Sequence, residues 1–161
     1  MPSVHVRDAT EHDIGFLTDV VIVTTSAQNR LPAGFDEKEW RARFSARTAA
    51  EVDPHEGGRA PTDLEHGTTY VIEIQGERAG RLRVVRSPEA VEIAGLQLLP
   101  AHQGHGIGTH LIEQLVVEAH QTGRRARATV ALDNPRAIAL YERLGFVAIR
   151  EEDGEALLEA R

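Results

Sequence analysis

The sequence lacks cysteine, long hydrophobic runs and an excess of positive charge. None of its 161 residues is Cys, which excludes disulfides, thiolate nucleophiles, and zinc or iron–sulfur sites with Cys ligands. The longest strictly aliphatic run covers residues 20–23, far short of the ~18 residues that a membrane-spanning helix needs. Residues 1–9 include no apolar segment typical of a secretory signal. We therefore expect a soluble, cytoplasmic protein without a membrane partner.

Acidic residues outnumber basic ones, 25 to 18, and give a formal net charge of −7. Because sequence-independent binding of nucleic acid needs a basic surface, this balance argues against a nucleic-acid partner. The short run of Arg124, Arg125 and Arg127 is the one feature that favours such a module. A hydrophobic fraction of 41% is typical of a globular protein, and the length fits a single domain over residues 1–161.

Hydrophobic periodicity predicts an α/β chain with the element order β-α-α-β-β-β-α-β-α-β-β. This order is typical of a mixed sheet with helices on its faces. Residues 51–67 hold turn formers and acids with little periodicity, which indicates a loop. Strands are expected at residues 4–6, 68–74, 78–86, 90–99, 125–132, 146–150 and 156–158, and helices at about 10–27, 36–49, 109–122 and 134–144.

Local signals place the ends and buried faces of the helices. Thr10 begins an acidic capping box, while Asp36 and Asn134 are suited to N-cap positions. On the first helix, Ile14, Leu17 and Val21 are spaced to share the buried face. On the second, Trp40 and Phe44 lie one turn apart, and we interpret them as core residues, with a cage for a substrate as the alternative.

Three alternating glycines, Gly104, Gly106 and Gly108, lie between an expected strand and an expected helix. Glycine lets the backbone approach a ligand closely, and the free N–H groups and dipole of a helix start favour an anion such as a phosphate. A Walker A loop would need a lysine before Thr109, and a Rossmann fingerprint would need a glycine in its place. A tight turn that binds nothing remains the alternative.

Two motifs carry a resemblance to a known family. The segment Gln103-Gly104-His105-Gly106-Ile107-Gly108 resembles the Gln/Arg-x-x-Gly-x-Gly/Ala signature of the GNAT superfamily of acetyl-CoA-dependent N-acetyltransferases. Further along, residues 134–146 meet every fixed position of the family's second motif, Asn-x-x-Ala-x-x-x-Tyr-x-x-x-Gly-Phe. The resemblance extends over residues 90–150, whereas the helices before it, over residues 11–66, carry no family signature.

The resemblance implies a mostly antiparallel central sheet with helices on both faces and a binding site for acetyl-CoA, which leaves as CoA. In this family two strands splay apart into a V, and the pantetheine arm lies in the opening. The implied main-chain contacts to the pantetheine are those of Leu96, Leu98 and Leu99. Those to the pyrophosphate are Gln103, Gly104, His105, Gly106, Ile107, Gly108 and Thr109.

The same resemblance implies direct attack by an amine in a ternary complex. A free N–H near Leu98 would stabilise the oxyanion, and Gly95 could mark the bulge that exposes this N–H, or simply accommodate packing. Asn134 and Ala137 would contact the cofactor from the following helix. Tyr141, about two turns after Asn134, would protonate or hydrogen-bond the departing thiolate.

The general base is less defined. Glu92 lies at the spacing of a catalytic glutamate that some relatives carry on this strand. It sits between Val91 and Ile93, which favours a solvent-side position, yet it shares its parity with Leu96 and Leu98. Transfer of the proton through water is the alternative.

In this family the first two helices and their loops cover the side on which the acceptor amine binds. We expect this acceptor side to be acidic. A negative surface would attract a cationic amine, either a small molecule or a peptide, although solvated helix and loop acids are the alternative interpretation. The acids expected on the acceptor side are Asp36, Glu37, Glu39, Glu51, Asp53, Glu56, Asp63 and Glu65.

His102, His105 and His110 lie near the glycine-rich turn, but we expect no metal there. A homodimer is one expectation for the assembly, and a CoA-binding sensor without catalysis is the alternative function.

Overall fold

The computed structural model describes residues 2–52 and 66–160. Two short 3-10 turns, η1 (Glu11–Asp13) and η2 (Pro100–His102), accompany the regular elements. The helices are α1 (Ile14–Ala27), α2 (Glu37–Val52), α3 (Ile107–Gln121) and α4 (Pro135–Arg143). The strands are β1 (Val4–Asp8), β2 (His66–Ile74), β3 (Glu77–Arg86), β4 (Ala90–Leu98), β5 (Arg125–Ala131), β6 (Phe146–Glu152) and β7 (Glu155–Ala160).

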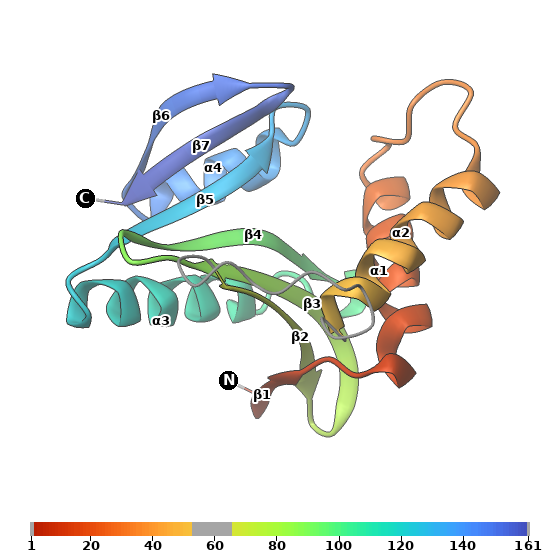
Figure 1. Cartoon of the computed structure of the whole chain (residues 1–161), viewed down its shortest axis with the longest axis horizontal. Helices are drawn as coiled ribbons and strands as arrows, with labels where there is room; N and C mark the ends of the chain where they lie inside the picture. Colours follow the sequence, from red (N-terminus) through yellow and green to blue (C-terminus); the bar gives the residue numbers. More distant parts are fainter. Residues whose placement is uncertain (1, 53–65, 161) are drawn as a thin grey trace.

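All seven strands join one sheet in the order β1-β2-β3-β4-β5-β7-β6 (Figure 1). Every neighbouring pair is antiparallel except β4 and β5, which run parallel. The predicted mixed, mostly antiparallel sheet is therefore confirmed. No helix of the described residues is long and apolar enough to cross a membrane.

The predicted element order is correct, but several boundaries differ. The first helix begins at Ile14, after η1, rather than at residue 10. The second runs on to Val52, so Glu51 is helical and not part of a loop, and β2 begins at His66. The rest of the predicted loop, with Asp53, Glu56, Asp63 and Glu65, lies outside the described residues.

The predicted caps form the hydrogen bonds expected of them, but the cap at Thr10 begins η1 and not α1. The backbone N–H of Thr10 donates to the Asp13 carboxylate at 2.8 Å, which is one half of a capping box. The side chains of Asp36 and Asn134 each accept the backbone N–H of the residue three positions further on, at 3.1 and 3.2 Å. Local chemistry therefore sets where α2 and α4 begin.

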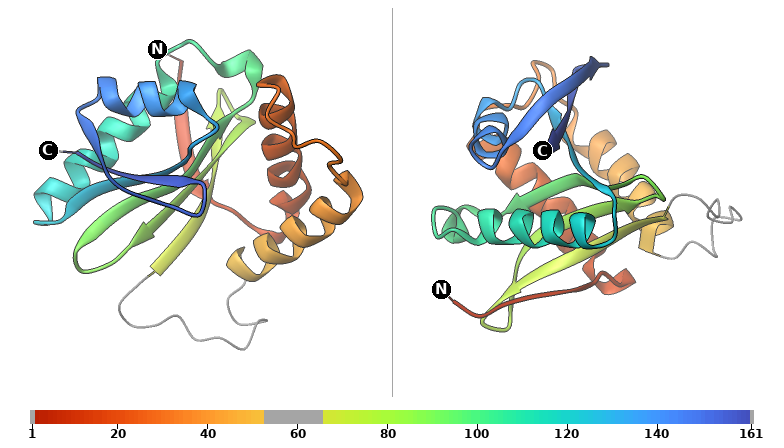
Figure 2. Two further views of the ribbon diagram at one scale, coloured as in Figure 1. Left: turned by 90° about the horizontal axis from the view of Figure 1, so that it is seen from above. Right: turned by 90° about the vertical axis from the view of Figure 1, so that its left-hand side faces the viewer.

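The helices cover opposite faces of the sheet (Figure 2). On one face, α3 and α4 close the main core, in which Ile72, Val84 and Ile112 are fully buried. On the other face lie α1 and α2, and Phe44 of α2 packs beneath the guanidinium of Arg81. Helices therefore cover both faces of the sheet.

The buried face of α1 differs from the predicted one. Leu17 and Val20 are fully buried, whereas Ile14 and Val21 are only half-buried. The helix contacts both the sheet and α2, so its buried surface is wider than a single stripe.

The aromatic pair of α2 divides between core and surface. Phe44 is buried, and its ring stacks on Trp40 with the centroids 4.8 Å apart. Trp40 itself is half-buried and lines a pocket of about 440 Å³ between α1 and α2. The interpretation of both residues as core is therefore correct for Phe44 and only partly correct for Trp40.

Asp13 ties the N-terminal turn to the sheet. Its carboxylate is only 3% exposed and accepts hydrogen bonds from the Arg7 guanidinium at 2.8 and 3.0 Å, while Arg78 lies 3.4 Å away. The hydrogen bonds from Arg7 hold the pKa of Asp13 far below its usual range. The folded state therefore favours the ionised carboxylate.

We predict that Asp13→Asn lowers the free energy of unfolding at pH 7 by about 2 kcal/mol, because it removes the buried carboxylate that Arg7 binds and leaves Arg7 only its longer contact of 3.4 Å with Glu73. The pKa of Asp13 is lowered in the folded protein, so this stabilisation is complete above about pH 4 and is lost as the pH falls further. Urea unfolding at pH 7 and pH 3 measures both effects.

The matched control is Asp19→Asn, since Asp19 pairs with Arg41 at the surface and its side chain is 58% exposed. Its removal should change the free energy of unfolding by less than about 0.5 kcal/mol. Equal effects of the two substitutions at pH 7 would contradict the role given to Asp13.

Candidate active site

The site begins where β4 and β5 separate. The two strands pair only over the first residues of each, from Ala90 opposite Arg125 to Ile93 opposite Ala128. Beyond Ile93 the ladder of β4 continues on one side only, with β3. The second half of β4 therefore borders a gap between the two strands.

A β-bulge in β4 lies at the start of this gap. Gly95 pairs with Arg83 and Ile93 with Val84, so Ala94 is the extra residue. The bulge predicted at Gly95 thus lies one residue earlier. Gly95 has a packing role instead, because a Cβ there would collide with the guanidinium of Arg81.

The bulge changes which side chains share a face of the sheet. Because Ala94 is extra, Glu92 lies on the face of Gly95 and Gln97, and not on that of Leu96 and Leu98 as its parity had predicted. This second face is the one that α1 and α2 cover. Glu92 is half-buried there and does not line the pocket described below.

At the end of β4, Leu96 and Leu98 turn their peptide groups toward the gap, whereas the next residue, Leu99, does not. The N–H of Leu99 donates to the carbonyl of Ala79 on β3 at 2.9 Å, so it is already used. Antiparallel strands alternate the direction of their peptide groups, which turns the N–H and C=O of Leu96 and Leu98 away from β3. The carbonyl of Leu98 accepts a hydrogen bond from the Gln103 side chain at 2.8 Å.

The glycine-rich turn positions the N-terminus of α3. Gly104 and Gly106 both adopt φ of +78°, the left-handed region that favours glycine, and Gly106 is the N-cap. No side chain caps this helix, so the N–H groups of its first turn point outward, as an anion site needs. Gly108, by contrast, lies inside the helix.

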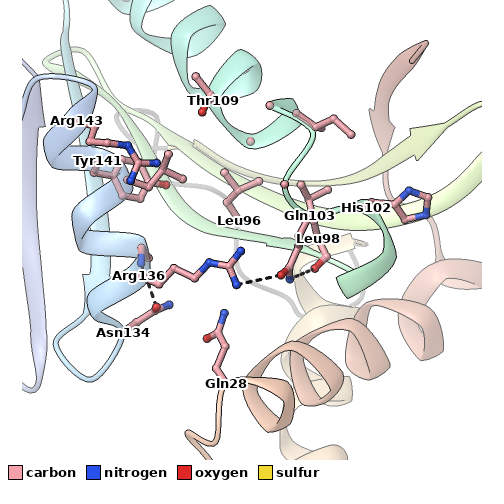
Figure 3. Close-up of a pocket in the computed structure, with 16 residues that line it drawn as sticks. Gln28, Leu96, Leu98, His102, Gln103, Thr109, Asn134, Arg136, Tyr141 and Arg143 are labelled. Carbon is pink, nitrogen blue, oxygen red and sulfur yellow. Dashed lines mark hydrogen bonds between the residues drawn. The ribbon is translucent and has the colours of Figure 1, made fainter. Parts of the chain in front are cut away.

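A pocket of about 420 Å³ joins the gap to this turn (Figure 3). Its charged side chains are Arg136 and Arg143, and no Asp or Glu of the described chain lines it. The remaining lining residues are Gln28, Leu96, Leu98, His102, Gln103, Gly104, Gly106, Ile107, Gly108, Thr109, Asn134, Ala137, Leu140 and Tyr141. In a chain of net charge −7, this pocket is suited to an anion.

The structure also places lining residues that the sequence analysis did not name. Arg136 and Arg143 are seven positions apart in α4, and helical spacing alone could have placed them beside Asn134 and Tyr141. Arg136 donates to the side-chain oxygen of Gln103 at 3.3 Å, across the gap. Gln28 comes from α1, and no pattern in the sequence indicates its position.

Tyr141 forms part of the pocket wall and is 5% exposed. Its ring packs edge-on against Phe146, with centroids 5.1 Å apart. Burial raises the pKa of the Tyr141 hydroxyl above its usual value, so the group stays protonated at neutral pH. It can therefore donate a hydrogen bond over the whole physiological range.

Three residues expected at the site do not line the pocket. Glu92 and Leu99 are outside the pocket, and His105 lines a separate one of about 280 Å³ together with His102. Over residues 2–52 and 66–160, no three His, Asp or Glu side chains are grouped as metal ligands would be.

The basic run that favoured a nucleic-acid partner makes contacts within the protein, although only one carboxylate of the described residues pairs with it. Arg125 and Arg127 both pair with Glu159, at 3.2 and 2.9 Å. Arg124 bonds to the carbonyl of Ser87 and to the side chain of Thr122. These contacts give the run a structural role.

Comparison with known families decides the identity of the fold. The model of the acetyltransferase (GNAT) family matches residues 35–146. The chain belongs to this GNAT family. Both motifs quoted from the sequence fall within or at the end of the matched region, which confirms the resemblance.

Two curated relatives match part of the GNAT chain. An N-acetyltransferase of Methanocaldococcus jannaschii is 33% identical over 85 residues, which cover 48% of this chain and 38% of the relative. The L-2,4-diaminobutyric acid acetyltransferase of Nocardia farcinica is 35% identical over 80 residues, which cover 47% of this chain and 41% of the relative. The chain thus matches about two fifths of the length of each relative.

Among solved structures, the GNAT chain is similar to the PaiA N-acetyltransferase of Thermoplasma acidophilum, which was determined in complex with coenzyme A. The TM-score is 0.72 at 16% identity, and the match covers 99% of both chains. At this identity the likeness shows a shared fold over the whole chain.

The glycine-rich turn gives a test of the backbone geometry. We predict that Gly106→Ala lowers the free energy of unfolding by about 1–2 kcal/mol, because a side chain at φ +78° is strained even though no atom lies within 4 Å. Gly108→Ala is the matched control, since Gly108 is helical and also has open space around it.

Alanine at position 108 should leave stability unchanged or raise it by up to about 1 kcal/mol, because alanine is the better helix former. Chemical denaturation of both variants measures the difference. A Gly106→Ala protein as stable as Gly108→Ala would show that the turn does not need the left-handed conformation.

Proposed function

We propose that this chain transfers the acetyl group of acetyl-CoA to a primary amine by direct attack in a ternary complex. The observation that carries the proposal is the pocket, in which unpaired main chain of β4 faces the uncapped N-terminus of α3. Membership of the GNAT family and the fold shared with a CoA-bound acetyltransferase support it.

The residues present fit the parts of acetyl-CoA. The N–H groups from Gln103 to Thr109, with Arg136 and Arg143 nearby, suit the phosphates. The peptide groups of Leu96 and Leu98 suit the amides of the pantetheine arm, because a strand edge pairs readily with another extended chain.

The proposed reaction needs few groups. The amine nitrogen attacks the thioester carbonyl carbon, and the N–H of Leu98 stabilises the oxyanion that forms, worth roughly 3 kcal/mol in the transition state. The carbon–sulfur bond then breaks, and the electron pair leaves on the CoA sulfur. Tyr141, kept protonated by its raised pKa, donates a hydrogen bond to this thiolate.

The proton lost by the amine needs an acceptor, because amines of pKa near 10 are protonated at neutral pH. Glu92 stays our candidate base on the spacing that the family resemblance implies, although its side chain is half-buried on the face that α1 and α2 cover and does not line the pocket. Transfer through water to the solvent is the alternative route.

For the acceptor we propose a small-molecule or peptide amine of cationic character. The exposed acids at the start of α2 support this choice only through Asp36, because Glu37 and Glu39 pair with Arg41 and Arg43 at 3.4 and 3.8 Å. One relative is named for an acid that carries two amino groups, which agrees with a small amine. A nucleic-acid or membrane partner is not part of the proposal, and a homodimer is an expectation still to be tested.

The second candidate function is a CoA-binding domain that senses or recruits without catalysis. It needs the pocket but not the Tyr141 hydroxyl. The presence of this hydroxyl in the pocket wall favours the enzyme.

Thermal unfolding and thiol release test the proposal together. CoA at 100 times its Kd should stabilise the protein by about 2.7 kcal/mol. Acetyl-CoA offered with polyamines, aminoglycosides, amino acids or peptides should release thiol with at least one of these classes. Tyr141→Phe should still bind CoA but lower kcat by roughly 100-fold, because it removes a donor used in the transition state.

Tyr70→Phe is the matched control, since the Tyr70 hydroxyl contacts Arg86 and does not line the pocket. It should retain turnover. CoA binding without thiol release from any amine would favour the sensor, and absence of CoA binding would contradict both functions.

A further inference from the structure

Gln28 reaches the cofactor pocket from the opposite side of the gap. It is the C-cap residue of α1, and among the described lining residues it is the one that the N-terminal helices supply. Figure 3 shows its side chain pointing from the end of α1 toward the region between Arg136 and Leu96. The family motifs of β4, α3 and α4 do not include it.

Arg30 fixes the orientation of the Gln28 carboxamide. One nitrogen of its guanidinium donates to Oε1 of Gln28 at 2.9 Å, and another donates to the Asp133 carboxylate at 3.0 Å. A guanidinium can only donate hydrogen bonds, so the oxygen of the carboxamide must face Arg30. The NH₂ group of Gln28 is thereby left on the side of the pocket.

Asn134 presents a second NH₂ group under the same constraint. Its Oδ1 accepts the N–H of Ala137 as the cap of α4, so its Nδ2 is the part left for the pocket. Asn134 directly follows Asp133, to which Arg30 is bonded. The contact from Arg30 to Asp133 therefore holds Gln28 and Asn134 at the same end of the pocket, one from each side.

We propose that Gln28 binds the pantetheine arm of acetyl-CoA, by donating a hydrogen bond from Nε2 to one of its amide carbonyls. Arg30 and Asp133 are positioning residues that hold the carboxamide in the donating orientation. An uncharged donor matches the uncharged pantetheine, because the phosphates have Arg136, Arg143 and the start of α3. This inference rests on the proposed function.

Isothermal titration with two ligands tests the assignment. CoA contains the pantetheine arm, whereas adenosine 3′,5′-bisphosphate does not. Gln28→Ala should weaken CoA binding about three- to tenfold and leave the affinity for the bisphosphate unchanged, which is the range expected for one neutral hydrogen bond. Gln28→Glu, which keeps the size but loses both donors, should weaken CoA binding at least as much.

Gln114→Ala is the matched control, since Gln114 is exposed on α3 and outside the pocket. It should leave both affinities unchanged. Thermal unfolding of each variant without ligand shows whether the substitution has changed the fold rather than the contact.

Asp133→Ala separates positioning from binding. Alone it should weaken CoA binding by a smaller factor than Gln28→Ala, because Gln28 keeps its donor but loses its fixed orientation. In the Gln28→Ala background it should have no further effect.

Additive effects of the two substitutions, or equal losses for CoA and the bisphosphate in Gln28→Ala, would overturn the inference. So would unchanged CoA binding in Gln28→Ala. Wild-type protein that does not bind CoA at all would instead contradict the proposed function, so the two failures are distinguishable.

Discussion

Peptide groups inside a protein need hydrogen-bond partners, and β4 leaves some of its own without a strand to bind. Its parallel ladder with β5 ends at Ile93, so the N–H and C=O groups of Leu96 and Leu98 face the gap between the two strands. Leaving such groups unpaired costs about 1–3 kcal/mol each, unless water or a ligand satisfies them. The Gln103 side chain satisfies one, the carbonyl of Leu98, and an extended ligand would satisfy more. The fold thus keeps a binding edge open in the middle of its sheet.

Charge and helix geometry select what enters this gap. The protein is acidic overall, yet the pocket holds two arginines, the start of α3, and no carboxylate from the described chain. Arg136 reaches across to Gln103, and Arg30 connects the end of α1 to the turn before α4. Both sides of the gap are therefore linked by side chains, although their strands have separated. A ligand with phosphates at one end and amides along its length matches this distribution.

Features set by neighbouring residues were predictable from the sequence, and features set by packing were not. The caps at Asp36 and Asn134 and the glycine-rich turn depend on short-range chemistry, and they were correctly predicted. The bulge at Ala94 depends on the pairing of β4 with β3 and on the space that Arg81 takes beside Gly95, which no local pattern reports. The extra residue, Ala94, places Glu92 on the face of the sheet opposite to the one that its position in the sequence predicted. Gln28 reaches the pocket through tertiary packing of α1 alone, so the sequence could not indicate it.

Amide hydrogen exchange measured by NMR at Leu96, Leu98 and Leu99 reports directly on the open edge. Without ligand, the amides of Leu96 and Leu98 should exchange faster than that of Leu99, which is bonded to Ala79, by roughly tenfold or more. Saturating CoA should bring all three to similar protection. Amides of Leu96 and Leu98 that are as slow as that of Leu99 before ligand is added, and that do not respond to CoA, would contradict an edge kept open for binding.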